Sequence, residues 1–395
     1  MPKATRQQTK DHNTRLVLKT IYNQDRISRA DIARATRLTK TTVSSIVADL
    51  IQEGLVEETG LGTSDGGKPP ILLSVVDGAR HFIGIDLANS EFRGATVNLR
   101  GDIIHRFSLP VKEADGEAAL QLIYTLIDNL LAASTKPVGG IGVGTPGLMD
   151  PHNGVIRQAV NLNWRDLPLR RLIVERYGLP CYIANDCQAA ALGEYTFTHN
   201  SLTPNLVVVK VGRGIGSGVV LNGQLYYGDG YGAGEIGHLT VVKNGELCAC
   251  GNRGCLETVA STKAIVQQAR QIALNNPGSP IHRFVKNPTQ IDTGVVLQAV
   301  QAGDEQLRAI ITRAGEYLGL AIANLVVILN VQHIVIAGSL ARFGAMVLEP
   351  AQQKMKECSM STLADSTELH ISSLGQDIVI KGAAALLLAN ELQLF

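Results

Sequence analysis

The chain has 395 residues, which is too long for one ordinary domain and predicts two or three. Aliphatic residues and glycine are abundant and aromatic residues make up 4% of the chain, a composition that suits a soluble α/β protein with buried parallel strands. Residues 1–40 hold ten basic and three acidic side chains, whereas residues 77–395 hold 25 basic and 27 acidic ones. A basic head on a near-neutral body indicates that only the head binds a polyanion. The alternative is that the basic side chains of the head only form a solvated surface.

The basic head has the apolar spacing and the caps of three short helices. Residues 13–25 carry apolar side chains at helical spacing and predict the first helix. Ser28 predicts the N-cap of a second helix, with Asp31 as its capping-box partner. Thr39 caps a third helix over about residues 40–52. The head therefore has the order of a helix-turn-helix motif.

A predicted hairpin follows these helices. Residues 55–58 and 71–75 predict two strands, joined by a loop rich in glycine and serine. The hairpin would be a wing whose tip places a cation along a minor groove of DNA. The start of the third helix would offer short polar side chains to a major groove. The predicted DNA-binding residues are Arg29, Thr39, Lys40, Thr41, Thr42, Ser44 and Lys68. A module of this shape could also serve only to dock proteins.

The body of the chain contains an internal repeat. Residues 81–101 predict strand, turn, strand, turn, and residues 205–223 repeat that plan, so we expect two similar α/β lobes with a cleft between them. The second copy has a glycine-rich turn, residues 212–218, that could grip phosphate or simply turn tightly. In the first copy, the turn after Asp86 has no glycine and ends in Glu91, whose carboxylate would repel phosphate. We expect this first turn to bind nucleotide poorly.

Amide, imidazole and carboxylate side chains recur where predicted strands end and on the glycine-rich loops. They are Asn161, Asn185, Asp186, Glu235, His238 and Glu257. Such groups accept and donate hydrogen bonds in pairs, which is how a protein holds the vicinal hydroxyls of a sugar. Asp186 could be a general base that removes a proton from a sugar hydroxyl, or it could only cap a helix.

One imidazole and three thiols fall within eighteen residues, at His238, Cys248, Cys250 and Cys255. Zinc favours such nitrogen and sulfur ligands and is four-coordinate in structural sites, so no position would be left for an activated water. A disulfide would use two thiols and leave the third unexplained. We expect a structural zinc clamp, and we expect Cys181, Cys187 and Cys358 to be reduced core residues.

The N-terminal residues 3–14 are polar, and no apolar run is expected to be long enough to span a bilayer. The sequence therefore predicts no leader peptide, no membrane partner and a cytoplasmic, reducing location.

These motifs resemble those of the ROK family (repressors, open reading frames and sugar kinases) over nearly the whole chain. The most specific match is Glu235-Ile-Gly-His238 ahead of Cys-x-Cys-Gly-x-x-Gly-Cys-Leu-Glu, and further matches are Gly144-Thr-Pro-Gly147, Asn161-Leu-x-Trp164 and Asn185-Asp186. The resemblance implies two actin-like, ribonuclease-H-type α/β lobes, a zinc ion on His238 and the three thiols, and sugar contacts at the six residues named above. It also implies that Asp186 is the catalytic base of kinase members.

With this fold class, α/β with an N-terminal winged helix-turn-helix, we expect three domains. The DNA-binding domain would span residues 1–76. The first lobe would span residues 77–200, completed by a C-terminal helix at about 377–395. The second lobe, with the zinc loop, would span residues 201–376.

Kinase members of the family carry Asp-x-Gly-Gly-Thr-[Lys/Asn] at the first hairpin and lack a DNA-binding head. This chain has Asp86-Leu-Ala-Asn-Ser-Glu91 and does have the head, so both differences favour the repressor branch. The prediction is a sugar-responsive regulator without enzyme activity, a repressor of carbohydrate-metabolism genes that a sugar or sugar phosphate releases from its operator, with Asp186 a vestigial base. Its partners would be double-stranded operator DNA, the sugar and further copies in a homodimer or homotetramer.

Two other functions fit the same sequence. One is an active ATP-dependent sugar kinase with an appended DNA-binding head. The other is a constitutive DNA-binding protein whose lobes only oligomerise. The sequence identifies neither the sugar nor the operator.

Overall fold

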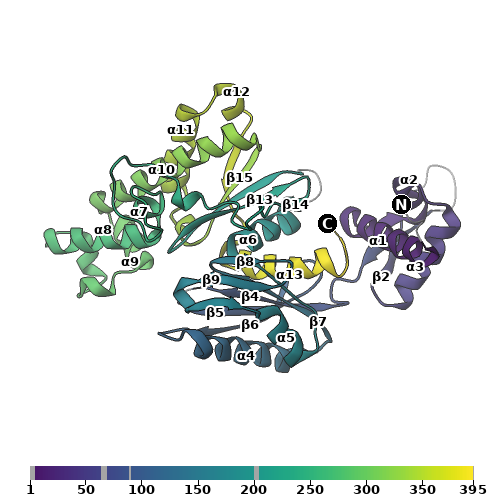
Figure 1. The fold of residues 1–395 in the computed structure, drawn as a ribbon. Coiled ribbons are helices and arrows are strands. Elements are labelled where there is room, and N and C mark those ends of the chain that lie inside the picture. The colour runs from purple at the N-terminus through teal and green to yellow at the C-terminus, as the bar shows by residue number, and fades with distance from the viewer. Residues whose placement is uncertain (1–4, 64–68, 89, 200–203, 395) are drawn as a thin grey trace. The chain divides into compact units, whose positions relative to one another are not determined.

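The computed structural model describes residues 5–63, 69–88, 90–199 and 204–394. The chain forms two compact units, Met1–Ala184 with Ala383–Phe395 and Asn185–Gly382. The first unit contains the head and the first lobe, and the second unit contains the second lobe (Figure 1). The expected domain boundaries stay a prediction, and the division after Ala184 lies before the lobe boundary expected at residue 200.

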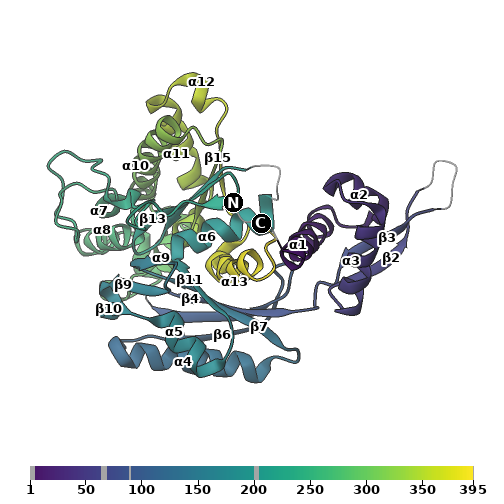
Figure 2. The ribbon, with the colours of Figure 1, turned by 45° about the vertical axis from the view of Figure 1, so that its right-hand side comes forward.

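The head contains three helices and a three-stranded sheet of order β1-β3-β2. Figure 2 shows the helices grouped around the β2–β3 hairpin. The elements are α1 (Arg6–Gln24), β1 (Ile27–Ser28), α2 (Arg29–Thr36), α3 (Lys40–Gln52), β2 (Val56–Leu61) and β3 (Ile71–Val75). Apolar side chains from all three helices form its core, among them Ile21, Ile32 and Val47.

The first helix begins at Arg6, seven residues before the expected start at residue 13. Thr5 caps it: the Thr5 hydroxyl accepts from the backbone N–H of Gln8 at 3.2 Å, and the Gln8 side chain accepts from the Thr5 N–H at 2.8 Å. This capping box satisfies N–H groups that a helix start leaves unpaired. The first turns are polar, so apolar spacing alone missed them.

The first lobe is built on a five-stranded sheet of order β11-β7-β4-β5-β6. Its strands are β4 (His81–Leu87), β5 (Glu91–Val97), β6 (Ile103–Pro110), β7 (Val138–Thr145) and β11 (Cys181–Asn185). Helices α4 (Gly116–Ala133) and α5 (Leu169–Tyr177) belong to the same lobe, and α4 packs on β5 and β6. A smaller sheet holds β8 (Leu148–Asp150), β9 (Val155–Ala159) and β10 (Trp164–Leu167).

The second lobe repeats this plan on a sheet of order β14-β13-β12-β15-β16. Its strands are β12 (Leu206–Val211), β13 (Ile215–Leu221), β14 (Gln224–Leu225), β15 (His333–Ala337) and β16 (Glu368–Ile371). Its helices are α6 (Asp186–Glu194), α7 (Glu257–Ala260), α8 (Thr262–Asn275), α9 (Thr293–Gln301), α10 (Glu305–Leu329), α11 (Ala345–Cys358) and α12 (Ser361–Ala364). The last helix, α13 (Ile378–Asn390), crosses the division between the two units.

The two sheets correspond strand by strand, which confirms the internal repeat. In each lobe an antiparallel hairpin, β4–β5 or β12–β13, is extended on its first strand by a parallel neighbour, β7 or β15. The next strand in each sheet is β11 or β16. A fold class of two similar α/β lobes behind a winged helix-turn-helix is therefore confirmed.

One glycine in each unit lets α13 approach closely. A Cβ on Gly142 of β7 would lie 1.8 Å from the carbonyl oxygen of Ala383, and a Cβ on Gly382 would lie 1.7 Å from that of Ala189. Only a residue without a side chain fits at such distances.

Helix α10 corrects one expectation about membrane spans. It is long and apolar enough to cross a bilayer by length and composition alone, so the expectation that no such run exists was wrong. Half of its most apolar window is buried inside the protein, and Leu318, Ile322 and Val326 lie in the core of the second lobe. Helix α10 is therefore a core helix of this lobe.

Candidate functional site

Asn185 and Asp186 lie where β11 ends and α6 begins, and the two side chains do different things. The Asn185 side chain caps α6: its carbonyl oxygen accepts from the backbone N–H of Cys187 at 2.9 Å. Asp186 is the first residue of the helix, so helix capping does not account for its carboxylate. One oxygen of that carboxylate instead lies 2.7 Å from the ammonium nitrogen of Lys210 on β12.

Glu235 and His238 lie near this ion pair, Glu235 directly before the short helical turn Ile236–His238 and His238 at its end. Burial raises the pKa of the Glu235 carboxyl, the positive charge of His238 opposes the shift, and the carboxylates of Asp186 and Glu257 add to it. The Nε2 atom of His238 lies 3.9 Å from a carboxylate oxygen of Glu235. Asp186, Glu235, His238 and Glu257 therefore gather in one polar cluster of the second unit.

Glu257 links this cluster to the second glycine-rich hairpin. One of its carboxylate oxygens accepts from the backbone N–H of Ile215 at 3.1 Å, and it lies 2.7 Å from where a Cβ of Gly214 would be. The backbone N–H of Ile215, which the glycine-rich turn could have offered to a phosphate, is therefore already bonded to the Glu257 carboxylate.

The predicted metal ligands come together as a tight group. The Nδ1 of His238 and the sulfurs of Cys248, Cys250 and Cys255 all lie within 4.8 Å of one another. The Nδ1 of His238 is 3.6 Å from the sulfur of Cys248, and the sulfurs of Cys250 and Cys255 are 3.7 Å apart. Zinc–sulfur bonds of about 2.3 Å in a tetrahedron would separate the sulfurs by about 3.8 Å. The residues therefore fit a tetrahedral metal ion.

The state of the cysteines agrees with this fit. No disulfide joins any of the six in the structure, and the three thiols of the cluster are placed as possible metal ligands. Cys181 and Cys187 are buried as expected, but Cys358 is exposed at the end of α11, so its expected place in the core was wrong.

Asn161 belongs to the first unit, whereas the other five predicted sugar contacts belong to the second. Asn161 is exposed in the helical turn Val160–Leu162. Nearby in the chain, the indole N–H of Trp164 donates to the carbonyl of Gly116 at 2.9 Å. The part of Asn161 in a common sugar site stays a prediction.

The first hairpin holds an internal ion pair. Asp86 on β4 is buried and lies directly opposite Arg93 on β5, and the guanidinium of Arg93 donates to the Asp86 carboxylate. The acidic residue at the start of the predicted phosphate turn is thus bound to an arginine of its own sheet.

The predicted DNA-binding residues that the structure describes fall into three groups. Lys40, Thr41 and Ser44 are exposed on the first turns of α3. Thr39 caps α3, and its hydroxyl lies 2.8 Å from that of Thr42, so these two side chains stabilise the helix start. The guanidinium of Arg29 lies 2.8 Å from the Glu58 carboxylate on β2 and fastens α2 to the wing. Lys68 lies outside the described residues.

Sequence reasoning missed Lys210. The signal was a lone cation in an otherwise apolar strand, Leu-Val-Val-Val-Lys-Val. A strand buried on both faces has no ordinary use for a charge, so such a lysine points to a buried partner. Spacing could not show that the partner would be Asp186, 24 residues earlier.

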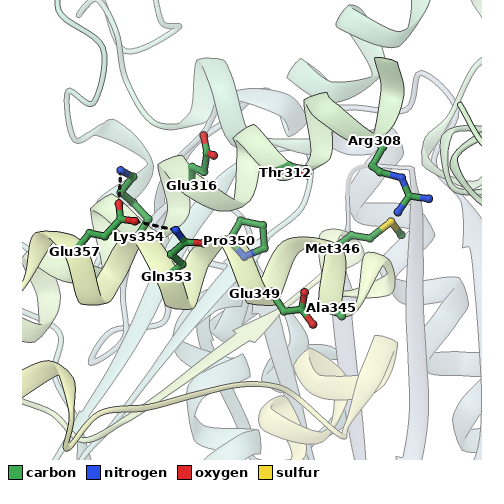
Figure 3. Close-up of a pocket in the computed structure, with 10 residues that line it drawn as sticks. All are labelled: Arg308, Thr312, Glu316, Ala345, Met346, Glu349, Pro350, Gln353, Lys354 and Glu357. Carbon is green, nitrogen blue, oxygen red and sulfur yellow. Dashed lines mark hydrogen bonds and ion pairs between the residues drawn. The ribbon is translucent and has the colours of Figure 1, made fainter. Parts of the chain in front are cut away.

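A separate pocket lies between α10 and α11, away from these residues. It measures about 620 Å³, and Figure 3 shows its lining of polar and charged side chains. Lys354 and Gln353 both bond Glu357 there, at 2.7 and 2.9 Å. None of the predicted site residues lines this pocket.

Both the head and the lobes of the chain match known protein families. A model described as the ROK family matches residues 82–390, and one described as winged helix-turn-helix DNA-binding matches residues 10–57. The chain is 33% identical over 389 residues to a xylose repressor of Caldicellulosiruptor bescii, covering 97% of each protein. It is also 33% identical over 317 residues to a glucokinase of Halalkalibacterium halodurans, covering 79% of this chain and 96% of that enzyme.

A solved structure described as a ROK family transcriptional regulator, a homologue of the E. coli MLC protein, has the same fold. It superposes with a TM-score of 0.82 at 28% identity, over 96% of both chains. The glucokinase match leaves out about a fifth of this chain, whereas both regulators match its full length, head included. The chain belongs to the ROK family and carries a winged helix-turn-helix at its N-terminus.

Proposed function

We propose that this protein is a sugar-responsive transcriptional regulator, a repressor of carbohydrate-metabolism genes. The observation that carries the proposal is the joining, in one chain, of a winged helix-turn-helix with a cluster of three carboxylates and an imidazole beside a metal-binding group. Carboxylates and amides paired in this way suit vicinal hydroxyls. Relatives named as xylose repressors match the chain from end to end.

Zinc is the metal that suits the cluster best, because its ligands are three thiolates and one imidazole. Its part is structural: four protein ligands leave no place for a reacting water. His238 would bind the metal through Nδ1 and face Glu235 through Nε2. The same clamp would hold Glu235 and Glu257, which flank it in the sequence, in place for the sugar.

The sugar would be held by Asn161, Asn185, Asp186, Glu235, His238 and Glu257. The five residues of the second unit lie together or next to one another in the chain, and Asn161, of the first unit, stays a predicted sugar contact. Sugar binding would then favour one of two arrangements of the protein. The effect on DNA can only come from a difference in sugar affinity between the two arrangements.

We propose that the chain has no sugar kinase activity. Asp86 is bound by Arg93, and Glu257 accepts from the N–H of Ile215, so groups at both hairpins that could meet ATP and its metal are already bonded within the protein. One carboxylate oxygen of Asp186 is bound by Lys210, which leaves the other oxygen to take a proton from a sugar hydroxyl. The alternative remains a kinase with a DNA-binding head, because ROK glucokinases are relatives too.

DNA recognition would use α3 in the major groove, with Lys40, Thr41 and Ser44 facing the bases and phosphates. A palindromic operator needs two such helices about 34 Å apart, so the protein would act as a homodimer or homotetramer in the cytoplasm.

A thermal-shift screen of the full-length protein tests the ligand. Neutral sugars, sugar phosphates and ATP with magnesium are compared. A ligand at a hundred times its dissociation constant adds about 2.7 kcal/mol of stability. A shift with a sugar or sugar phosphate and none with ATP supports the regulator. A shift with ATP, followed by phosphate transfer in a coupled assay, would establish the kinase instead.

A further inference from the structure

Lys210 occupies the middle of the second lobe's sheet. Its strand, β12, pairs with β13 on one side and β15 on the other, and Lys210 itself lies opposite Gly216 and Ala337. The backbone of Lys210 is therefore fixed from both sides. Its side chain is 22% exposed and that of Asp186 is 19% exposed, so the 2.7 Å ion pair between them is largely withdrawn from water.

Lys210 stands within a group of carboxylates. Asp186 binds it directly, and the carboxylates of Asp186 and Glu257 both lie near enough to Glu235 to act on it electrostatically. A carboxylate oxygen of Glu235 lies 3.9 Å from the Nε2 atom of His238. A carboxylate oxygen of Glu257 accepts from the backbone N–H of Ile215 at 3.1 Å. With Lys210 bound to Asp186, the carboxylates of the cluster exceed its cations. An anionic ligand would meet like charges here, whereas hydroxyl groups would meet acceptors.

We propose that Lys210 is a specificity-determining residue of the sugar site. By pairing with Asp186 it orients that carboxylate as an acceptor and is itself withdrawn from the ligand, so the site takes an uncharged sugar and rejects the phosphate ester of that sugar. The inference rests on the proposed function, because it concerns the same site. It decides between the two ligand classes that the sequence leaves open.

The test is a calorimetric titration of the full-length, zinc-loaded protein at fixed pH and salt. The ligands are xylose, glucose and N-acetylglucosamine, each beside a phosphate monoester of the same sugar. We expect the wild-type protein to bind one neutral sugar at least about tenfold more tightly than its ester, since one unfavourable charge contact is enough for such a ratio.

Asp186→Asn is the informative variant. It removes the carboxylate charge that pairs with Lys210, and the preference for the neutral sugar over the ester should fall by about tenfold or more. Adding Lys210→Met to this variant should restore the preference, because the freed cation is gone. Lys210→Arg should keep the wild-type preference. Lys286→Met, at an exposed lysine of the same unit, should change nothing.

These ratios separate specificity from folding, because a merely structural ion pair would weaken both ligands together. If the double variant Asp186→Asn, Lys210→Met does not fold, Asp186→Asn and Lys210→Arg still give the ratios. A wild-type preference for a phosphate ester, or an unchanged ratio in Asp186→Asn, would overturn the inference and leave the regulator standing. Binding of none of the six ligands would overturn the inference and count against the proposed function.

Discussion

The guanidinium of Arg100 lies 4.6 Å from the centre of the Tyr22 ring and stacks on it. Tyr22 belongs to α1 of the head, and Arg100 lies in the turn that joins β5 to β6 of the first lobe. Arg100 also donates to the Tyr22 carbonyl at 2.7 Å, and the Tyr22 hydroxyl donates to the carbonyl of Leu99 at 2.8 Å. The head is thus bonded to the strand whose other end holds Arg93 against Asp86.

Arg100→Met should uncouple the head from the lobes. The substitution keeps the length of the side chain but removes the cation–π contact, which contributes about 0.5–2 kcal/mol, and the bond to the Tyr22 carbonyl. Sugar affinity should stay unchanged, while the ratio of operator affinities without and with sugar should fall towards one. Calorimetry and DNA-binding anisotropy measure the two quantities. Arg171→Met, at an exposed arginine of α5, is the matched control, and equal ratios in both variants would show that Arg100 does not couple the parts.

The buried hydroxyl of Tyr22, at the same contact, should make the stability of the protein depend on pH. Burial raises the pKa of its hydroxyl from 10.0 to about 12, an effect that Arg100 opposes and Asp77 strengthens. A raised pKa in the folded protein means that the folded state holds the proton more tightly than the unfolded state. The stabilisation is therefore complete below pH 10 and is lost as the pH rises towards 12. Unfolding of the wild type and of Tyr22→Phe between pH 9 and about pH 11 should show a steeper loss for the wild type, and parallel curves would contradict this account.

Removal of the metal should abolish the sugar response. Cys250→Ser removes one ligand of the cluster, so the loop that carries Glu235 and Glu257 would lose its clamp. We expect about one zinc ion per chain in the wild type, loss of zinc in the variant, and no thermal shift with the sugar that stabilises the wild type. Cys358→Ser changes a free, exposed thiol outside the cluster and should keep both properties. A zinc-free variant that still responds to sugar would contradict the clamp.

Lys40→Gln should weaken DNA binding through the phosphate backbone. Lys40 is exposed at the first turn of α3, and one lost phosphate contact should reduce the slope of log affinity against log salt by about one. Affinity should fall on specific and unrelated DNA alike. Lys356→Gln, at an exposed lysine of α11, should leave the slope unchanged. If the slope is the same for the wild type and Lys40→Gln, Lys40 does not contact a DNA phosphate, which would contradict the predicted role of α3.

Local patterns predicted well wherever neighbours in sequence decide the structure. The bounds of α3 and β3, the two strand–turn–strand hairpins and the metal cluster follow from spacing, caps and ligand chemistry. The early start of α1 was missed because its first turns have no apolar stripe and are held by the cap at Thr5.

Pairings between distant residues could not be predicted. Nothing in the spacing of Asp186 and Lys210 shows that the start of α6 lies beside β12. Likewise, Arg93 faces Asp86 only because β4 and β5 pair in that register. Asp186 looked equally suited to be a cap or a base. Because Asn185 provides the cap, the Asp186 carboxylate is available to Lys210.

The measurement that tests the central claim most directly is operator release. A DNA fragment that the full-length protein selects from a random library is labelled, and its complex is titrated with the sugar that gives the largest thermal shift. The account predicts that a saturating sugar raises the dissociation constant of the complex by about 5–150-fold, the usual range of coupling between two sites. A dissociation constant that does not change when the sugar is bound would contradict the account and leave a DNA-binding protein that does not respond to sugar.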